Sequence, residues 1–421
     1  MLLGAGTGAP APDATAEDAA RAIATALIKG DYAAVEARFD ATMKQALPLE
    51  KLRATCAPVL ATAGKFLRME APRTSVTRGH DVVVLPLVFE LVTWDLKVVL
   101  DAQKRVAGMF FTPGAGPWEP PPYGRARVLE APVTVGPAAL PGVLMLPWGK
   151  GPFPAVVLVH GSGAHDLDET IGPQKPFRDL ALGLAARGIA SVRYEKRNHA
   201  HPDQFTADRK YTVAEESVDD AVAAVQLAAA APAIDARRVW VVGHSLGGFL
   251  APRIAAHAPG GVAGIVILAG STRPLEELVI EQVRYLEGAD SPDMAKAEAF
   301  AKIVRDPGLA DGQTVDMLGA SIPGSYFLDL RRYDPVRTVA ALRVPVLVLQ
   351  GERDYQVRRA DYDGWVKGLA GHASARLQLY PALNHLFEAG SGESRPTEYL
   401  RPGLHIAPEV IADIATFILR P

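Results

Sequence analysis

Hydrophobic positions in the first quarter of the chain recur at helical spacing. Between residues 15 and 70, apolar side chains stand three to five positions apart in a background rich in Ala, Leu, Lys and Glu, which predicts helices. Residues 82–111 then read as short apolar or alternating runs, such as 82–85 and 96–100, which predict strands. Helices followed by strands indicate a small α+β domain over residues 15–112, with residues 1–14 expected to be disordered.

The pattern changes after a segment rich in Pro and Gly at 113–127, which is predicted to be a linker. From residue 128, short apolar runs alternate with helix-length segments, and the runs from 154 onward are apolar throughout, as in strands buried on both faces of a parallel sheet. Strands are predicted at 140–146, 154–160, 189–194, 239–244, 264–269, 345–350 and 376–380. Helices are predicted at 176–187, 213–230, 247–258, 359–369 and 407–419. Residues 128–421 are therefore expected to form a doubly wound, mostly parallel α/β sheet, with a helical, charged cap inserted at about 275–335.

Composition excludes several classes of protein. The 421 residues carry a formal net charge of −3 without a long run of one sign, so neither nucleic acid nor an anionic membrane surface is an expected partner. Cys56 is the only cysteine, which excludes an intrachain disulfide and a multi-cysteine metal site. No apolar run is long enough to span a bilayer. The N-terminus lacks the features of a complete signal peptide, and a remnant of one is the alternative. The cellular compartment, cytoplasmic or periplasmic and secreted, stays open, as does a homodimer.

The sequence Gly243-His244-Ser245-Leu246-Gly247 lies between a predicted strand and a predicted helix. A G-x-S-x-G pattern in this setting is typical of a nucleophile elbow, where small residues let the chain turn sharply and hold the serine in a strained, exposed pose. A glycine-rich turn with an incidental serine is the alternative, and the flanking strand and helix disfavour it.

A serine hydroxyl needs a neighbouring imidazole as base and an acid to orient that imidazole. Asp354 follows the predicted strand at 345–350, and Asp334 is a competing acid that follows the insertion rather than a strand. His385 follows the last predicted strand. The order serine, aspartate, histidine is that of α/β-hydrolases. The rival histidines, neither of which comes directly after the last strand, are His372 and His405.

Amide donors for an oxyanion are expected from two places. One is the backbone N–H of Leu246, directly after the serine, and the other belongs to the loop after the strand at 154–160. In that loop Ser162 is preferred as the donor, with Gly163 as the alternative. His160 is interpreted as a packed loop anchor rather than a base.

Charged side chains follow the strand at 189–194. The run 193–197, Arg-Tyr-Glu-Lys-Arg, is interpreted as a salt-bridged loop that fixes the oxyanion loop, with a substrate contact as the alternative. His165, Asp166, Asp168 and Glu169 are the residues that could suggest a metal cluster. They lack tight ligand spacing, so no metal is expected.

With these motifs in place, the C-terminal part resembles the α/β-hydrolase superfamily. The segment His160-Gly161-Ser162-Gly163, together with 168–172, 175–177 and 193–197, is similar to bacterial carboxylesterases of the EstD type. Those proteins are also similar in having a small N-terminal α+β domain ahead of the hydrolase, which resembles a domain of unknown function. Dienelactone hydrolases are similar in outline but use cysteine where this chain has Ser245.

The resemblance implies a serine carboxylesterase with Ser245, Asp354 and His385 as its triad, acting on a small-molecule ester without a cofactor. Short or medium acyl chains are preferred as substrates. A peptidase or amidase, or a thioesterase, on the same fold is the alternative, and a non-catalytic ligand-binding protein is a third reading. The residues expected to contact substrate are His160, His244, Tyr355 and, from the cap, Tyr326.

Overall fold

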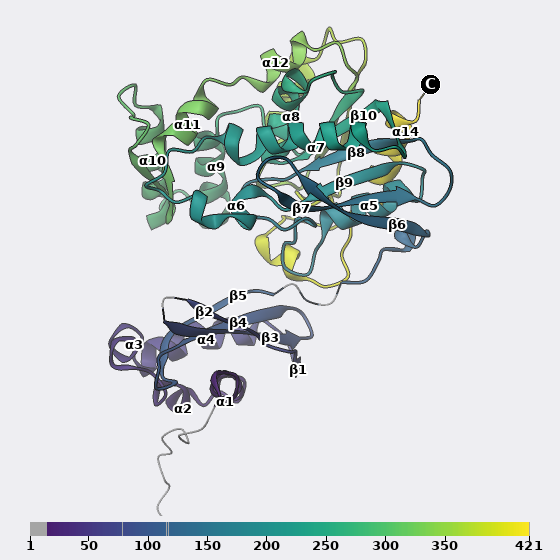
Figure 1. Cartoon of the computed structure of the whole chain (residues 1–421). Helices are drawn as coiled ribbons and strands as arrows, with labels where there is room; N and C mark the ends of the chain where they lie inside the picture. The colour runs from purple at the N-terminus through teal and green to yellow at the C-terminus, as the bar shows by residue number, and fades with distance from the viewer. Residues whose placement is uncertain (1–14, 78, 115, 117, 421) are drawn as a thin grey trace, which may run out of the picture. The chain divides into compact units, whose positions relative to one another are not determined.

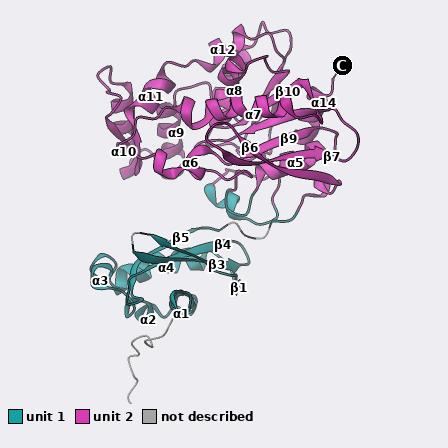
Figure 2. Ribbon diagram, in the orientation of Figure 1, with its two compact units in different colours: residues 1–119, 171–174, 396–403 teal, residues 120–170, 175–395, 404–421 magenta. Residues whose placement is uncertain are grey.

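The computed structural model describes residues 15–77, 79–114, 116 and 118–420, so the segment 1–14 with its predicted disorder lies outside the described residues. The chain forms two compact units, coloured separately in Figure 2. Among the described residues, the first unit takes in those up to Glu119 together with 171–174 and 396–403, and the second takes in 120–170, 175–395 and 404–420. None of the described helices is long and apolar enough to cross a bilayer.

The first unit packs helices against an antiparallel sheet. Helix α1 begins at a capping box in which Thr15 and Asp18 exchange hydrogen bonds, and it buries Ile23 and Leu27. Its helices are α1 (Ala16–Ile28), α2 (Tyr32–Glu36), α3 (Ala41–Ala46) and α4 (Leu49–Ala61). Its strands are β1 (Phe66–Met69), β2 (Arg73–Thr77), β3 (His80–Phe89), β4 (Thr93–Leu100) and β5 (Val106–Pro113). The helical prediction for 15–70 is wrong at its end, because β1 pairs antiparallel with β3 there.

The second unit is built on a mixed sheet that has, within the described residues, eight strands in the order β15-β14-β11-β10-β8-β9-β7-β6. Strands β6 to β10 of this sheet are labelled in Figure 1. Strands β8 to β15 of this sheet run parallel to one another, whereas β7 pairs antiparallel with both β6 and β9. The strands are β6 (Val128–Val135), β7 (Leu140–Pro147), β8 (Phe153–Val159), β9 (Ala190–Tyr194), β10 (Ile234–His244), β11 (Gly264–Leu268), β14 (Val346–Gly351) and β15 (Ala375–Tyr380). The predicted doubly wound, mostly parallel sheet is confirmed.

Successive side chains of the parallel strands enter two different cores. In β10, Val241 packs in the core that contains helices α7 and α8, whereas Val242 packs with α5 and α14 on the opposite face. Helices therefore cover both faces, which is why these strands are apolar throughout. The flanking helices are α5 (Pro176–Ala185), α7 (Asp219–Ala230), α8 (Leu246–His257), α13 (Arg359–Gly368) and α14 (Pro408–Ile418). Helix α7 is preceded by a π-helical turn at Ala214–Val218, and the short helix α6 spans Arg197–Ala200.

Strand β6 was not predicted from the sequence. It is the edge strand of the sheet, most of its residues are exposed or half-buried, and it contains Pro132. Proline is tolerated on an edge strand because no neighbour needs its N–H, but it weakens the sequence signal for a strand.

The insertion between β11 and β14 is helical with one departure. Its elements are α9 (Leu275–Glu287), α10 (Pro292–Arg305), β12 (Thr314–Met317), β13 (Ala320–Pro323), α11 (Gly324–Arg331) and α12 (Pro335–Ala341). Strands β12 and β13 form a hairpin that the sequence did not predict. Its two-residue turn, Leu318 and Gly319, has positive φ at both positions, and leucine is not the residue type that normally signals such a turn.

Candidate active site

Ser245 occupies a sharp turn between β10 and α8. Its backbone has φ +54° and ψ −116°, a conformation that costs a non-glycine residue energy and recurs at functional sites. The turn is possible because a Cβ atom on Gly243 would lie 2.1 Å from the carbonyl oxygen of Gly247, and one on Gly247 would lie 2.1 Å from that of Val159. The backbone N–H of Ser245 donates to the backbone carbonyl oxygen of Leu268, in β11, at 2.8 Å. The geometry is that of a strand–turn–helix elbow.

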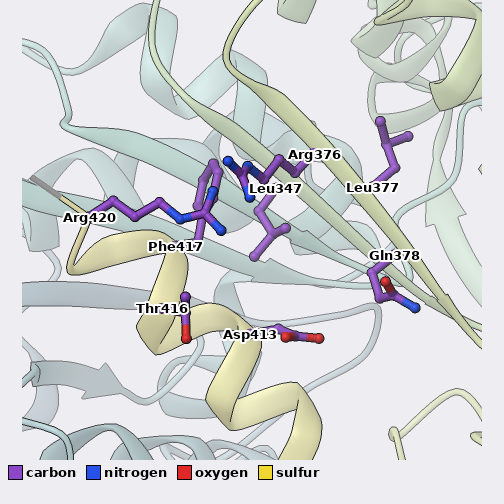
Figure 3. A pocket seen from close by; sticks show the side chains of 8 residues that line it. All are labelled: Leu347, Arg376, Leu377, Gln378, Asp413, Thr416, Phe417 and Arg420. Atoms are coloured by element: carbon purple, nitrogen blue, oxygen red, sulfur yellow. The ribbon is translucent and has the colours of Figure 1, made fainter.

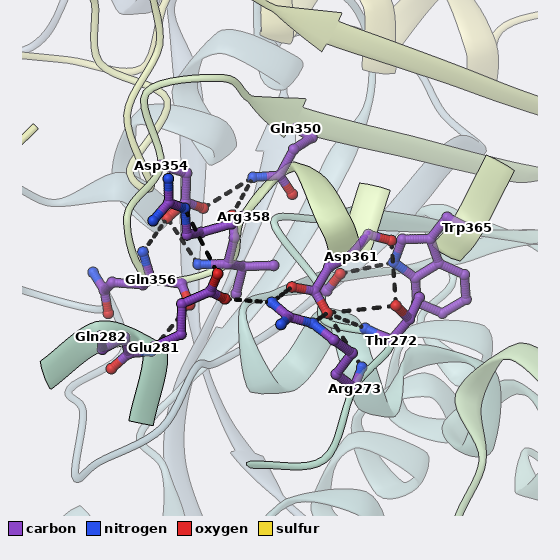
Figure 4. Close-up of polar contacts among 12 residues, drawn as sticks. Thr272, Arg273, Glu281, Gln282, Gln350, Asp354, Gln356, Arg358, Asp361 and Trp365 are labelled. Carbon is purple, nitrogen blue, oxygen red and sulfur yellow. Dashed lines mark hydrogen bonds and ion pairs between the residues drawn. The ribbon is translucent and has the colours of Figure 1, made fainter. Parts of the chain in front are cut away.

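Asp354 and His385 contact each other at the ends of neighbouring strands β14 and β15. His385 Nδ1 lies 2.6 Å from Asp354 Oδ2, and both side chains are buried. Gln350 Nε2 donates to the same oxygen at 3.0 Å, and the backbone N–H groups of Gln356 and Val357 donate to Oδ1 at 2.7 and 3.0 Å (Figure 4). The carboxylate is therefore held in one orientation by donors on both oxygens.

This contact has a consequence for the histidine tautomer. Because Nδ1 of His385 faces a carboxylate, it carries the proton of the neutral ring, which leaves Nε2 unprotonated and able to act as a base. Ser245, Asp354 and His385 all follow the carboxyl ends of parallel strands, at one edge of the sheet. That edge is where open α/β sheets carry their ligands.

The competing acid and histidines have other contacts. Asp334 caps the N-terminus of α12. The ring of His372 contacts the backbone carbonyl of Leu342 at 3.1 Å, and the ring of His405 contacts the carboxylate of Asp179 at 3.1 Å. The structure thus gives each rival a structural partner of its own.

The loop after β8 lies against the elbow. A Cβ atom on Gly161 would be 3.1 Å from Ser245 Cβ, so this glycine allows a close approach. The N–H of Gly161 donates to Glu169 Oε1 at 2.6 Å, which removes it from the set of free amide donors. Ser162 is exposed, and Leu246 is the first residue of α8, where backbone N–H groups have no partner within the helix.

Sequence reasoning missed a buried pair beside the serine. Glu169 Oε2 lies 2.9 Å from His244 Nδ1, and His244 Nε2 lies 3.0 Å from the backbone oxygen of His385. An imidazole with an acceptor at each nitrogen satisfies both contacts only as the cation. Burial lowers the pKa of His244, but the charge and hydrogen bond of Glu169 outweigh it, so the pKa is raised overall.

The contact with His244 also changes the pKa of the Glu169 carboxylate. Burial raises the pKa of Glu169, but the charge of His244 and its hydrogen bond lower it further, to about 2. His244 was expected to contact substrate, and its two ring nitrogens are instead both occupied by protein groups. No sequence motif signals this partnership, because the two residues lie 75 positions apart.

His160, also expected near the substrate, is a buried ring among aromatic neighbours. Its Nε2 donates to the backbone oxygen of Asp166 at 3.0 Å, and its ring packs against Phe177 with centroids 4.9 Å apart. Burial lowers the pKa of His160 to about 3, so the ring is neutral. These contacts agree with its interpretation as a loop anchor.

The two tyrosines expected to contact substrate are both buried. The ring of Tyr355 stacks on Tyr285 of α9, with centroids 5.5 Å apart and an interplanar angle of 5°. The hydroxyl of Tyr326, in α11, donates to Glu216 Oε2 at 3.1 Å. Tyr355 is the residue directly after Asp354 in the sequence. The hydroxyl of Tyr326 is instead bound to a residue of the π-helical turn before α7.

The charged run after β9 makes contacts within the protein. Arg193 is fully buried and pairs with Asp168 and, at 2.9 Å, with Glu130. Arg197 pairs with Asp220, with Nε donating at 2.8 Å. Among the described residues, no three His, Cys, Asp or Glu side chains are grouped so that they could hold a metal ion.

A surface groove lies elsewhere in this unit (Figure 3). Its lining comes from strand β15 and from helix α14 and its C-terminal end, with one residue from β14. It is lined by Leu347, Arg376, Leu377, Gln378, Asp413, Thr416, Phe417 and Arg420. None of the candidate catalytic residues takes part in this groove.

Comparison with known proteins gives two family matches. Residues 156–400 match the model of the alpha/beta hydrolase family. Residues 20–109 match the model of a family described as proteins of unknown function, DUF3887. The first match covers more than half of the chain and includes Ser245, Asp354 and His385.

Similar individual proteins carry esterase names. The chain is 35% identical over 382 residues to Esterase EstD of Thermotoga maritima, a match that covers 90% of this chain and 89% of that protein. Est1E of Butyrivibrio proteoclasticus, solved with ferulic acid bound, is 16% identical with a TM-score of 0.47, covering 68% of this chain and 98% of that chain. An esterase of Pyrococcus furiosus is 14% identical with a TM-score of 0.45, and the match covers 72% of this chain and 94% of that chain.

Proposed function

Because the chain belongs to the alpha/beta hydrolase family, we propose that it hydrolyses carboxylic esters with Ser245 as the nucleophile. The observation that carries the proposal is the 2.6 Å contact between His385 and Asp354, at the same edge of the sheet as the strained turn of Ser245. Similarity to Esterase EstD over most of both chains supports ester bonds as the target.

In the proposed reaction, Ser245 Oγ attacks the ester carbonyl while His385 Nε2 takes its proton and then returns it to the leaving alcohol. Asp354 stabilises the imidazolium through Nδ1. The N–H groups of Leu246 and Ser162 donate to the oxyanion, with Gly163 as the alternative to Ser162. Water then releases the acyl group by the same route, so the reaction needs no cofactor or metal.

The expected substrate is a small-molecule ester with a short or medium acyl chain. We propose that the insertion between β11 and β14 acts as a cap over the acyl chain. Its helix α9 is apolar on one side, where Leu278 and Val279 are buried. We retain the domain assignment of 15–112, the linker 113–127 and the hydrolase domain 128–421 as part of the proposal. A homodimer stays a prediction, which light scattering of the purified protein would check.

The test is hydrolysis of p-nitrophenyl esters from acetate to palmitate by the purified protein, alongside Ser245→Ala and His385→Ala. We expect turnover by the intact protein that declines toward palmitate and disappears in both variants. Turnover that survives Ser245→Ala would overturn the assignment of the nucleophile. An intact protein that cleaves p-nitroanilides or thioesters but no ester would replace the esterase by an amidase or a thioesterase.

A further inference from the structure

Lys196 is a buried lysine whose ammonium group contacts the loop after β8. Only 2% of the residue is exposed, and Nζ donates to the carbonyl oxygens of Gly161 at 2.8 Å and Gly163 at 3.0 Å. A buried charge is costly unless it is paired and hydrogen-bonded, so its presence here needs a reason. Both acceptors belong to the loop that abuts Ser245, and the proposed reaction uses an amide of that loop.

The orientation of one peptide group in this loop follows from these contacts. In a trans peptide, the carbonyl oxygen and the following N–H point in opposite directions. Because the carbonyl of Gly161 points to Lys196, the N–H of Ser162 points away from the ammonium. The N–H of Gly161 is held separately by Glu169 Oε1 at 2.6 Å. The two buried charges thus fix the peptide groups on either side of the Gly161 Cα atom.

We propose that Lys196 is a positioning residue for the oxyanion hole, which holds and polarises the peptide group whose N–H, on Ser162, is the second donor to the oxyanion. An ammonium on the carbonyl oxygen withdraws electron density from the peptide group and strengthens its N–H as a donor. The charge is shielded from water, so it also favours the negative charge that develops on the substrate oxygen. This inference rests on the proposed ester hydrolysis at Ser245.

A second set of contacts keeps the ammonium in place. Glu216 Oε2 lies 3.5 Å from Lys196 Nζ, and Asn198 Nδ2 donates to Glu216 Oε1 at 2.6 Å. Tyr326 donates to Glu216 at 3.1 Å, which connects the insertion to the same carboxylate. Glu216 therefore has two other donors, and it offers the lysine a fixed counter-charge.

The neighbouring residue provides a matched control. Arg197 is a partly buried cation whose guanidinium pairs with Asp220 rather than with the loop after β8. Removing its charge disturbs a comparable ion pair without changing the contacts of Gly161 or Gly163. The comparison of Lys196→Met with Arg197→Met therefore separates an effect on the oxyanion loop from a general loss of buried charge.

The experiment measures kcat and KM for p-nitrophenyl butyrate, and the affinity for a trifluoromethyl ketone that forms a tetrahedral adduct with serine. For Lys196→Met we expect kcat to fall by about 100-fold with little change in KM, because both acylation and deacylation pass through an oxyanion. The affinity for the ketone should fall in parallel. Arg197→Met should keep both values within a few-fold of the intact protein.

Unchanged kcat and ketone affinity in folded Lys196→Met would overturn the inference, as would an equal loss in Arg197→Met. If Lys196→Met does not fold, the double variant Lys196→Met/Glu216→Gln removes both charges of the pair and is measured in its place, with the same expectation. An intact protein without esterase activity defeats the proposed function itself, whereas an active intact protein with an unaffected lysine variant defeats this inference alone.

Discussion

The carboxylate of Glu169 and the imidazole of His244 form a buried pair at 2.9 Å that joins the loops around Ser245. Glu169 holds the N–H of Gly161 with its other oxygen, and His244 holds the backbone oxygen of His385 with its other nitrogen. The pair therefore connects the loop after β8, the elbow and the loop after β15. In the proposed mechanism these loops supply the oxyanion donor, the nucleophile and the base.

Removal of the charge of Glu169 should lower kcat more than it raises KM. In Glu169→Gln the imidazole of His244 loses its counter-charge, so the contacts to Gly161 and His385 are expected to loosen. We expect kcat/KM for a p-nitrophenyl ester to fall about 10- to 100-fold, mainly through kcat, because small displacements of catalytic groups are costly. Glu393→Gln, at an exposed pair with Arg395, is the control and should leave both constants unchanged. A rise in KM with unchanged kcat in Glu169→Gln would argue against a positioning role.

The same variant should reveal the pH range in which the pair stabilises the fold. The pKa of Glu169 is lowered to about 2, so its contribution is complete above its ordinary pKa and is lost as the pH falls from about 4.5 toward 2. The pKa of His244 is raised, so its contribution is complete below its ordinary pKa of 6.5 and is lost as the pH rises through the folded value. The difference in unfolding free energy between the intact protein and Glu169→Gln should therefore be largest between about pH 4.5 and 6.5. Urea unfolding across this range measures it, and a difference that does not vary with pH would contradict the ion pair.

His160 should make the fold sensitive to acid. Burial lowers its pKa to about 3, so between pH 6.5 and 3 the unfolded chain binds a proton at this ring that the folded chain does not. Stability is then lost at up to about 1.4 kcal/mol per pH unit as the pH falls. His160→Gln retains a side-chain donor for the Asp166 carbonyl but does not titrate. Its unfolding free energy should decline less steeply over this range, and parallel curves for the two proteins would refute the assignment.

The sequence was informative wherever a short motif coincided with a strand end. Ser245, Asp354 and His385 each lie at or after the carboxyl end of a strand that the apolar pattern predicted, so their placement at one edge of the sheet followed from the topology. The partners of Lys196 and Glu169 could not be predicted in the same way. Their contacts join segments that are far apart in sequence, 35 positions for Lys196 and Gly161, and such pairs leave no periodic pattern.

Weak local signals account for the missed elements of the fold. The exposed, proline-containing strand β6 lacks alternation, and the turn of the β12–β13 hairpin has leucine at position 318, where Asn, Asp or Gly is usual. Glu216 was not predicted to matter, because its role depends on Tyr326 reaching it from the insertion. Burial and tertiary contact decide these cases, and neither is encoded in a short window of residues.

The turn at Ser245 should be intolerant of a methyl group at Gly243. An added Cβ would lie 2.1 Å from the carbonyl oxygen of Gly247, so the elbow must open to accommodate it. We expect Gly243→Ala to abolish ester hydrolysis and lower the melting temperature by several degrees, since overpacking costs about 1–3 kcal/mol. Gly371→Ala is the control because open space surrounds the position of its Cβ. Full activity of Gly243→Ala would show that the turn is less constrained than the geometry indicates.

A second network anchors the start of the insertion, where the chain leaves β11. The carboxylate of Asp361, in α13, is fully buried and accepts from the backbone N–H of Thr272 at 3.0 Å and from the guanidinium of Arg273 at 2.7 Å (Figure 4). Arg273 also donates to Glu281 of α9 at 2.6 Å. Its hydrogen bonds to Asp361 raise the pKa of the guanidinium, so Arg273 stays a cation at any physiological pH.

Arg273→Met should therefore weaken the insertion without disturbing the candidate catalytic residues. Removing one partner of a buried ion pair costs about 3–5 kcal/mol, which chemical denaturation would measure. KM for p-nitrophenyl butyrate is expected to rise several-fold while kcat stays close to that of the intact protein, because Ser245 and His385 keep their contacts. Arg358→Met is the matched control, since Arg358 is 43% exposed in its side chain and lies 4.0 Å from the same Glu281, a pair worth less than about 1 kcal/mol. A fall in kcat with unchanged KM in Arg273→Met would instead place this network in the support of the catalytic loops.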